Sequence, residues 1–408
     1  ESKRKDRFDP SSYGAMADGH SKDTAAVQAA IDAAATQGGT VRLAGGTFVC
    51  GTLYLKSNVA LEITNSATLL ASPDIADYGT DTHHNRYRNE PELDRCFLFA
   101  QDAENVTICG SGVIDGNAAA FPNAGSIYRP MLLRVLRCRD VRVQNLRLLN
   151  AAAWTTAFLD SDFLWATDLH IENHRNYNGD GLDFDGCRHV WVRGCYIDGT
   201  DDNLCLQSSG LPVQDVHISD CAFTSVCAGI RIGLKSIGEI SGVVISNCTM
   251  RNVWREGIKL ECTEGGSITD VLVENITMHN VRRPIFAILN NRYRPDDLGS
   301  SVELDHLPPI GTMARLWFAG ITAVDDEEMA HAQRRFDDDI MGEPKFGGCR
   351  LDANAAHPIQ DVTIRDFWYT AIGGVRLADL PAAPYPEVPD RLQGPAACAS
   401  ENYYPDWS

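Results

Sequence analysis

The sequence predicts an all-β protein built as a parallel β-helix, with one capping helix near its N-terminus and a long loop insertion near its C-terminal end. Three observations support this fold class. Short phrases of alternating apolar residues recur 21 to 28 residues apart, a second set of apolar pairs keeps nearly the same spacing, and an amphipathic segment precedes the first repeat. Each repeat is therefore expected to form one coil of a solenoid with a continuous apolar interior.

Residues 1–50 are expected to form an N-terminal cap and the first coil. Asp23 is placed to N-cap a helix over residues 24–37, which Gly38 and Gly39 would end. Three apolar residues recur at helical spacing on one face of this segment: Val27, Ile31 and Ala34. Because a solenoid exposes its interior at each end, an amphipathic helix at this place is expected to cover the first coil.

The first family of strand phrases alternates with a period of two and is rich in Val and Ile, which is typical of strands. No hairpin turn of the Asn-Gly kind and no helical segment of ten or more residues separates the phrases, so the strands are expected to stack in parallel. The phrases include DVRVQNLRL, DLHIEN, HVWVRGCYI, DVHISDCAF, GVVISNCTM, DVLVENITM and DVTIRDFWY. We align them at Leu169, Val190, Val216, Val243 and Val271.

A second strand family follows in each coil. Its inward apolar pairs are Leu182/Phe184, Leu204/Leu206, Ile230/Ile232 and Ile258/Leu260. Successive side chains of a strand point to opposite faces, so the residues between and beyond these pairs are expected to point outward into a groove. These outward residues are Asp183, Cys205, Gln207, Arg231, Lys259 and Glu261.

The repeat spacing is lost in residues 290–358, which we interpret as a loop insertion over the coils. Residues 377–408 are rich in proline and are expected to run along the outside as a C-terminal tail. Because a solenoid can absorb the whole length, residues 1–408 are expected to form a single domain. The sequence does not indicate the oligomeric state.

Composition excludes several classes of function. The formal net charge of -19 argues against a nucleic-acid partner, and no apolar run is long enough to span a membrane. The 13 cysteines include no Cys-x-x-Cys pair, so buried free thiols are favoured over a zinc site, and we expect no metal and no cofactor. The chain begins without Met or an apolar leader, which suggests a removed signal peptide or a late start.

Carboxylates gather where two successive strands of the second family begin. Asp180 precedes one strand, Asp201 and Asp202 precede the next, and neighbouring coils are ~4.8 Å apart, so these groups and Asp183 are expected to lie together. Mutual repulsion would raise at least one pKa and keep one acid protonated, as glycoside cleavage requires. Asp-Asp and Asp-Gly also mark turns, but their place on consecutive strands favours a site.

The chain resembles the polygalacturonase-type glycoside hydrolases of family 28, inverting enzymes of the pectin lyase-like superfamily on a right-handed parallel β-helix. The opening YGAMADGHSKDTAAVQAAIDAA and the following GGTVRLAGGTF are similar to the family's cap and first coil. The family's Asn-x-Asp-Gly motif is matched from Asn178, and its Asp-Asp motif by Asp201 and Asp202. The resemblance implies that Asp202 is the general acid and that Asp180 and Asp201 hold and deprotonate the attacking water.

Three positions depart from the family pattern. Its Gly-His-Gly motif falls on Cys227-Ala228-Gly229, and the lysine that usually follows its Asp-Asp motif falls on Gln207. Its Arg-x-Lys pair, which binds the substrate carboxylate, falls on Lys259-Leu260-Glu261. An acid at the second position of that pair would repel a uronate, so the specificity is expected to differ from that for polygalacturonan.

Other residues would extend the substrate site. Arg231 and Lys259 are cations on the groove face, and further arginines follow at positions 282, 283, 292 and 294, where they would bind a substrate carboxylate or pair with the chain's own acids. His83 and His84 would enter the groove or form an exposed loop. Trp154 would stack on a sugar ring or pack at an edge.

These patterns together predict an inverting hydrolase that binds an oligo- or polysaccharide of plant or algal origin. The loop at 82–89 and the insertion would wall off one end of the groove, which favours exo action. The reacting sugar would be neutral or deoxy, or a uronic acid held by relocated arginines. A polysaccharide lyase with Ca²⁺ on the Asp cluster and a non-catalytic glycan-binding β-helix are the alternatives. Access to polymers favours a secreted or periplasmic location.

Overall fold

The computed structural model describes residues 6–82, 95–122, 129–290, 309–326 and 348–371. Packing divides the chain into two compact units. The N-terminal unit comprises Glu1–Asn85, Pro91–Asp201 and Val216–Cys221, and the C-terminal unit comprises Arg86–Glu90, Asp202–Asp215 and Ala222–Ser408. The boundary between them falls between the two candidate residues Asp201 and Asp202, so each unit is described by itself.

The described residues of the N-terminal unit form one α-helix and short strands that pair in parallel. The helix is α1 (Thr24–Ala35). The strands are β1 (Asp6–Phe8), β2 (Asp18–Lys22), β3 (Gly39–Leu43), β4 (Gly46–Cys50), β5 (Leu53–Leu55), β6 (Val59–Ile63), β7 (Ala67–Ala71), β8 (Cys96–Gln101), β9 (Glu104–Gly110), β10 (Val113–Asp115), β11 (Met131–Leu136), β12 (Arg139–Gln144), β13 (Arg147–Leu149), β14 (Thr156–Leu159), β15 (Asp162–Thr167), β16 (His170–Asn173), β17 (Leu182–Asp185), β18 (Arg188–Arg193) and β19 (Tyr196–Gly199).

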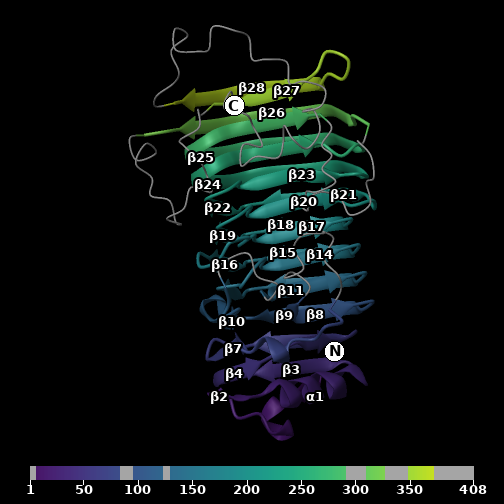
Figure 1. Cartoon of the computed structure of the whole chain (residues 1–408), viewed down its shortest axis with the longest axis vertical. Coiled ribbons are helices and arrows are strands. Elements are labelled where there is room, and N and C mark those ends of the chain that lie inside the picture. Colours follow the sequence, from purple (N-terminus) through teal and green to yellow (C-terminus); the bar gives the residue numbers. More distant parts are fainter. Residues whose placement is uncertain (1–5, 83–94, 123–128, 291–308, 327–347, 372–408) are drawn as a thin grey trace, which may run out of the picture. The chain divides into compact units, whose positions relative to one another are not determined.

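Each coil of this unit contributes one strand to each of three parallel columns. One column runs through β8, β11, β14 and β17, the second through β9, β12, β15 and β18, and the third through β10, β13, β16 and β19. Parallel strands joined in this way almost always wind with a right-handed connection. The predicted class, a right-handed parallel β-helix, is therefore confirmed (Figure 1).

One predicted register is wrong. We aligned Leu169 with Val190, but Val190 pairs with Leu164, and the phrase that contains Leu169 belongs to the third column, where Ile171 pairs with Ile197. The two strands are separated by a corner at Asp168, whose φ is 52°. A corner of only two residues, Asp168 and Leu169, interrupts the period of two very briefly, so alternation alone could not tell the two strands apart.

Acidic and amide residues form the corners of the coils. Five aspartates open predicted phrases, and all have φ between 51° and 57°: Asp140, Asp168, Asp215, Asp270 and Asp361. Asp and Asn enter this left-handed region more readily than other residues with a side chain. In the C-terminal unit, Asn275 and Asn247 stack as a ladder, with Nδ2 of Asn275 donating to Oδ1 of Asn247 at 3.0 Å. The repeated Asp and Asn therefore mark turns of the solenoid.

Helix α1 lies across the end of the N-terminal unit beside β3 (Figure 1), as a cap should. Its predicted apolar face is buried. It ends at Ala35, two residues earlier than expected, and the side chain of Asp23 does not cap it. Instead, this carboxylate accepts hydrogen bonds from the main-chain N–H groups of Met16 (2.7 Å) and Ala17 (3.0 Å), and so ties the preceding loop to the helix.

The C-terminal unit is a second stack of parallel strands. They are β20 (Leu204–Ser208), β22 (Ala222–Ser225), β23 (Ile230–Ser236), β24 (Glu239–Cys262), β25 (Ser267–Leu289), β26 (Thr312–Val324), β27 (Arg350–Ala353) and β28 (Gln360–Thr370), while β21 (Val213–Ser219) divides between the two units. Leu204 pairs with Ile230, which pairs with Ile258, as the spacing predicted. All three side chains are fully buried, so the alternation correctly predicts which residues of these strands form the core.

The predicted loop insertion at 290–358 is partly wrong. Strand β26 lies inside this range and pairs with β25 and β28, and β27 pairs with β25. Residues 312–324 do alternate, with Leu316, Phe318 and Ile321 buried, but they lack the opening Asp and follow a proline pair, which hid the repeat. The remainder of the insertion at 291–308 and 327–347 and the predicted tail lie outside the described residues.

Twelve cysteines are described, and all twelve are free thiols. Ten of them are buried, which agrees with their predicted role as small apolar residues of the coils. Among the described residues, no helix has both the length and the apolar character that crossing a membrane requires.

Candidate active site

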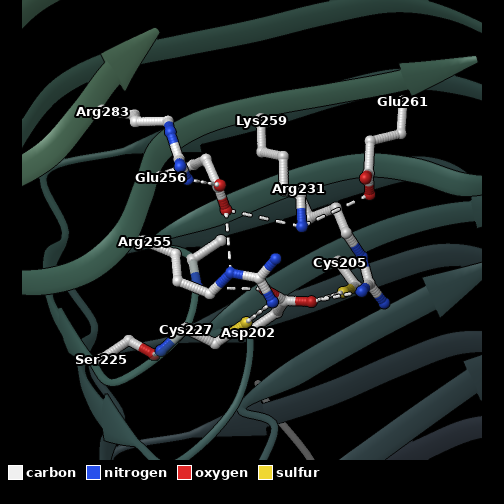
Figure 2. Close-up of polar contacts among 11 residues, drawn as sticks. Asp202, Cys205, Ser225, Cys227, Arg231, Arg255, Glu256, Lys259, Glu261 and Arg283 are labelled. Atoms are coloured by element: carbon white, nitrogen blue, oxygen red, sulfur yellow. Dashed lines mark hydrogen bonds and ion pairs between the residues drawn. The ribbon is translucent and has the colours of Figure 1, made fainter. Parts of the chain in front are cut away.

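The predicted groove residues of the C-terminal unit do leave one face of its strands. Cys205, Arg231 and Lys259 pair in register on β20, β23 and β24, between the inward apolar residues (Figure 2). Most of this face is nevertheless closed to solvent, since Cys205 and Gln207 are buried and the side chains of Lys259 and Glu261 are 3% and 1% exposed. Charged side chains occupy the face and neutralise one another.

Seven charged side chains form what we call the buried charge network: Asp202, Arg231, Arg255, Glu256, Lys259, Glu261 and Arg283 (Figure 2). The network holds four basic and three acidic groups. Buried charges are stable only when they are paired and hydrogen-bonded. Arg231 neutralises Asp202, and Arg255, Lys259 and Arg283 neutralise Glu256 and Glu261, so each buried acid depends on its cationic neighbours.

Asp202 lies at the lower edge of this network and is fully buried. Its Oδ1 accepts a hydrogen bond from the main-chain N–H of Ala228 at 3.1 Å. Its Oδ2 forms an ion pair with Nη1 of Arg231 at 2.5 Å, and the thiol of Cys205 lies 3.8 Å from the same oxygen. Burial alone would raise the pKa of Asp202, but the charges of Arg231 and Lys259 outweigh burial and lower it.

A lowered pKa is the opposite of what a general acid needs in the free protein, because the acid must carry a proton. We expected crowding among carboxylates to raise a pKa and keep one acid protonated. For Asp202 the cations of the network have the larger effect on the pKa, because an opposite charge within about 4 Å favours the ionised form. Sequence reasoning missed this effect because Arg231 lies on the next coil, 29 residues along the chain.

The segment at the place of the family's Gly-His-Gly motif supports Asp202 through its main chain. Cys227 N donates to Ser225 Oγ at 2.8 Å, and Cys227 O accepts from Arg255 N at 3.1 Å. These bonds fix the peptide whose N–H, at Ala228, binds the carboxylate. The segment therefore keeps a hydrogen-bonding function toward the predicted acid although the histidine is replaced.

Lys259 is enclosed by acids. Its Nζ lies 3.5 Å from Oε2 of Glu256 and 3.6 Å from Oε2 of Glu261. Burial would lower the pKa of Lys259, but these two carboxylates outweigh burial and raise it. The charge of Lys259 is thus compensated inside the protein, at the position where the family pattern has a cation for the substrate carboxylate.

Glu256, like Arg255, is a residue of the network that sequence reasoning missed. It is fully buried, and Nη1 of Arg283 lies 2.7 Å from its Oε1, with Arg255 and Lys259 within 3.7 Å. Burial opposes its ionisation, but Lys259, Arg255 and Arg283 together hold the pKa of Glu256 at about 2. Its only sequence signal was an acid just before the apolar pair Ile258 and Leu260.

The contact with Glu256 decides between the two interpretations of Arg283. This arginine pairs with one of the chain's own acids and is itself 2% exposed. Arg282 lies over the ring of Trp254, with its guanidinium carbon 4.9 Å from the ring centroid. Arg292, Arg294, His83 and His84 lie outside the described residues.

In the N-terminal unit, a buried arginine holds the Asn-x-Asp-Gly motif. Arg129 is 1% exposed, and it donates from Nη1 to Tyr177 O and from Nη2 to Asn178 Oδ1, each at 2.7 Å. Asn178 has φ of 53°, which Asn tolerates. A Cβ on Gly179 would lie 2.3 Å from Thr200 Oγ1, so only glycine fits there. No sequence pattern pointed to Arg129.

The carboxylates of this unit are placed by main-chain bonds. The carbonyl of Asp180 accepts from Thr155 N at 2.9 Å and Thr155 Oγ1 at 2.7 Å, and Asp180 and Asp183 are both buried. Asp201 is partly exposed. Because Asp202 and the buried charge network belong to the other unit, the clustering of these carboxylates with Asp202 stays a prediction. Trp154 is 8% exposed, which favours the packed alternative over a sugar platform.

Replacing Arg129 with lysine tests whether the two hydrogen bonds from its guanidinium hold the Asn-x-Asp-Gly motif in place. Lysine keeps the charge but cannot donate to Tyr177 O and Asn178 Oδ1 in parallel. We expect a loss of about 1–3 kcal/mol in the free energy of unfolding, measured with urea. Arg137→Lys is the matched control, because Arg137 also binds with two donors but lies exposed against Asp102. Equal losses in both variants would contradict a special role for Arg129.

The fold and the retained acid motifs place the chain among the glycan-processing parallel β-helix proteins. A family model described as "Glycosyl hydrolases family 28" matches residues 46–301, more than half of the chain. The chain therefore belongs to family 28 of the glycosyl hydrolases.

Individual relatives agree with this assignment. The chain is 26% identical over 262 residues to a "Probable polygalacturonase" of Vitis vinifera, covering 57% of this chain and 52% of that protein. It is 25% identical over 243 residues to an "Exo-poly-alpha-D-galacturonosidase" of Dickeya chrysanthemi, covering 47% and 40%. The aligned part thus spans about half of each relative's length. An exopolygalacturonase from Thermotoga maritima shares the fold, with a TM-score of 0.70, 20% identity and coverage of 89% and 87%.

Proposed function

We propose that this chain is an inverting glycoside hydrolase that removes sugars from the end of pectin-like polysaccharides or their oligosaccharides. The observation that carries the proposal is the setting of Asp202. A carboxylate that opens a strand is buried, hydrogen-bonded by a main-chain N–H and paired with a cation from the next coil. Such a costly arrangement is typical of functional sites, where perturbed carboxylates cluster.

In this mechanism Asp202 gives a proton to the glycosidic oxygen as the bond to the sugar breaks. Asp180 and Asp201 orient a water molecule on the opposite face of the sugar and accept its proton. The water oxygen bonds to the anomeric carbon, so the configuration there is inverted. This requires ~6.5–9.5 Å between the acid and base carboxyl groups, which leaves room for the water.

Exo action is supported by the names of two similar proteins, the Dickeya chrysanthemi relative and the Thermotoga maritima enzyme, both of which are described as exo-acting. An exo-acting enzyme needs its groove closed beyond the terminal sugar. The segments that we expect to close it, at 82–89 and within 290–358, lie mostly outside the described residues.

The Lys259–Glu261 pair supports a specificity altered from that for polygalacturonan. A family member with two cations at these positions would present two positive charges to a uronate, whereas this chain presents an ion pair at 3.6 Å. Both side chains are almost fully buried, so their charges compensate each other rather than a charge on the substrate. We propose that this pair leaves carboxylate recognition to another residue.

The test is to incubate the protein with a panel of oligosaccharides from pectin and other plant or algal polysaccharides and to follow the products by proton NMR. We expect cleavage with initial release of the inverted anomer. Release of the retained anomer would contradict the inverting mechanism. An unsaturated product that is lost with a chelator would indicate the lyase alternative. Binding without turnover across the panel would indicate a glycan-binding β-helix.

A location outside the cytoplasm, either secreted or periplasmic, is part of the proposal because polymeric substrates are met there. The free thiols of the described residues are more usual in a reducing compartment. Cell fractionation with detection of the protein distinguishes a location inside the cytoplasm from one outside it.

A further inference from the structure

Arg231 is the more exposed partner of the ion pair with the predicted acid. Its side chain is 13% exposed, whereas that of Asp202 is fully buried. Arg231 leaves β23 between Cys205 and Lys259 of the neighbouring coils. Figure 2 shows its guanidinium bending past the small Cys205 side chain to the carboxylate of Asp202. A larger residue at position 205 would fill the space that the guanidinium crosses.

The two oxygens of Asp202 are held in different ways. Oδ1 is bound by the main-chain N–H of Ala228, which is fixed within the Cys227–Gly229 turn. Oδ2 is bound by the side chain of Arg231, which can change rotamer. Oδ2 is therefore the oxygen that can become available to a glycosidic oxygen. For this oxygen to carry a proton and reach the substrate, Arg231 has to move away.

Only another anion can replace Asp202 as a partner of equal strength for Arg231, because hydrogen bonds between ionised groups are about twice as strong as neutral ones. The other acids of the network are engaged, since Glu256 pairs with Arg283 and Lys259, and Glu261 pairs with Lys259. An acidic substrate that enters the site supplies such an anion. Once Arg231 has moved, Lys259, Cys227 and Arg255 still lower the pKa of Asp202, but the largest lowering influence is gone and burial favours proton uptake more strongly.

Resting on the proposed function, we infer that Arg231 is a positioning residue that covers the carboxylate of Asp202 in the free protein and is drawn away by a carboxylate of the substrate. Binding of an acidic sugar is then coupled to protonation of Asp202. Oδ2 of Asp202 takes up one proton from solvent and later passes it to the glycosidic oxygen. The substrate therefore carries a uronate that Arg231 recognises, although the lysine position of the family's carboxylate-binding pair has become Glu261.

Calorimetry tests this coupling without turnover. We would measure binding of a galacturonate oligosaccharide and of its carboxyl-reduced counterpart near pH 5, in buffers with different ionisation enthalpies. The expected result is binding of the acidic ligand at least about tenfold tighter than the reduced one. Proton uptake should accompany only the acidic ligand, because Asp202 becomes protonated when Arg231 leaves. Equal affinities, or binding of the acidic ligand without proton uptake, would overturn the inference.

Two substitutions test whether the effect is specific to Arg231 or follows from the loss of any positive charge. Arg231→Gln should bind both ligands within about twofold and show no proton uptake, whereas Arg315→Gln, in an exposed pair with Asp270, should behave like the wild type. If Arg231→Gln does not fold, Asp202→Asn provides the second readout and should bind the acidic ligand without proton uptake. Unchanged discrimination in Arg231→Gln, or unchanged uptake in Asp202→Asn, would exclude the coupling.

Turnover then distinguishes this inference from the proposed function. Where oligosaccharides are cleaved, Arg231→Gln should shift the acidic-to-neutral fall of kcat/KM toward higher pH, because kcat/KM reports the free protein, in which Arg231 keeps Asp202 ionised. Cleavage by a wild type that does not discriminate acidic from reduced ligands would refute the coupling and leave the hydrolase. Discrimination with proton uptake but no cleavage would refute the hydrolase and leave the coupling.

Discussion

Replacing Asp202 with asparagine is expected to lower kcat by about 10²–10⁴-fold on the oligosaccharide that the wild type cleaves best. Asparagine keeps the shape of the side chain and can still accept the N–H of Ala228. It has no proton to give to the leaving oxygen, and general acid catalysis typically contributes a factor of this size. The rate is measured by following reducing-end release, and the fold is checked by circular dichroism.

The matched control is Asp270→Asn. Asp270 also begins a strand phrase, has φ of 57° and pairs with an arginine, but that pair is exposed. Asparagine adopts the same backbone conformation there, so kcat should stay within about twofold of the wild type. If Asp202→Asn kept kcat within tenfold of the wild type while folded, the proton would have to come from another group, and the assignment of Asp202 would be wrong.

Replacing Glu256 with glutamine is expected to reduce the free energy of unfolding by about 3–5 kcal/mol. Glu256 is fully buried and touches Arg283, Arg255 and Lys259. Removing one partner of a buried ion pair leaves the other charges uncompensated, which costs more than the pair itself contributes. Urea unfolding followed by tryptophan fluorescence measures the loss.

Glu62→Gln is the matched control for this substitution. Glu62 pairs with Arg42 at 3.4 Å near the surface, so its loss should cost less than about 1 kcal/mol. Similar losses for both variants would show that the buried charge network contributes no more than a surface pair.

The lowered pKa of Glu256 also predicts how the free energy of unfolding depends on pH. The pKa of Glu256 is lowered from 4.5 to about 2 by its cationic neighbours. A group whose pKa is lower in the folded state stabilises the protein above its unfolded pKa, and this contribution is lost as pH falls through the folded pKa. We therefore expect roughly 3 kcal/mol from Glu256 near neutral pH, declining between about pH 4.5 and 2. Glu256→Gln should flatten the unfolding free energy over this window.

Much of the fold could be predicted from the sequence because a solenoid is held by contacts between neighbouring repeats. Each coil must bury the same apolar face, so the pairs at Leu204, Ile230 and Ile258 recur with a visible spacing. Where the spacing failed, a local feature was responsible. The corner between β15 and β16 is only two residues long, and strand β26 follows a proline pair in a stretch that we interpreted as an insertion.

The sequence by itself determined the repeating strands, their inward residues, the capping helix and the positions of the acidic motifs, because these depend on local alternation and on short motifs along the chain. Only the tertiary structure decided the ionisation of Asp202 and the engagement of Lys259 and Arg283. The partners of Asp202 and Arg283 come from the neighbouring coil, 29 and 27 residues away in the sequence. Lys259 has its partners on its own strand, and only the fold shows that all of them are buried together. The electric field at a buried carboxylate is set by such neighbours, and it changes sharply over a few ångströms.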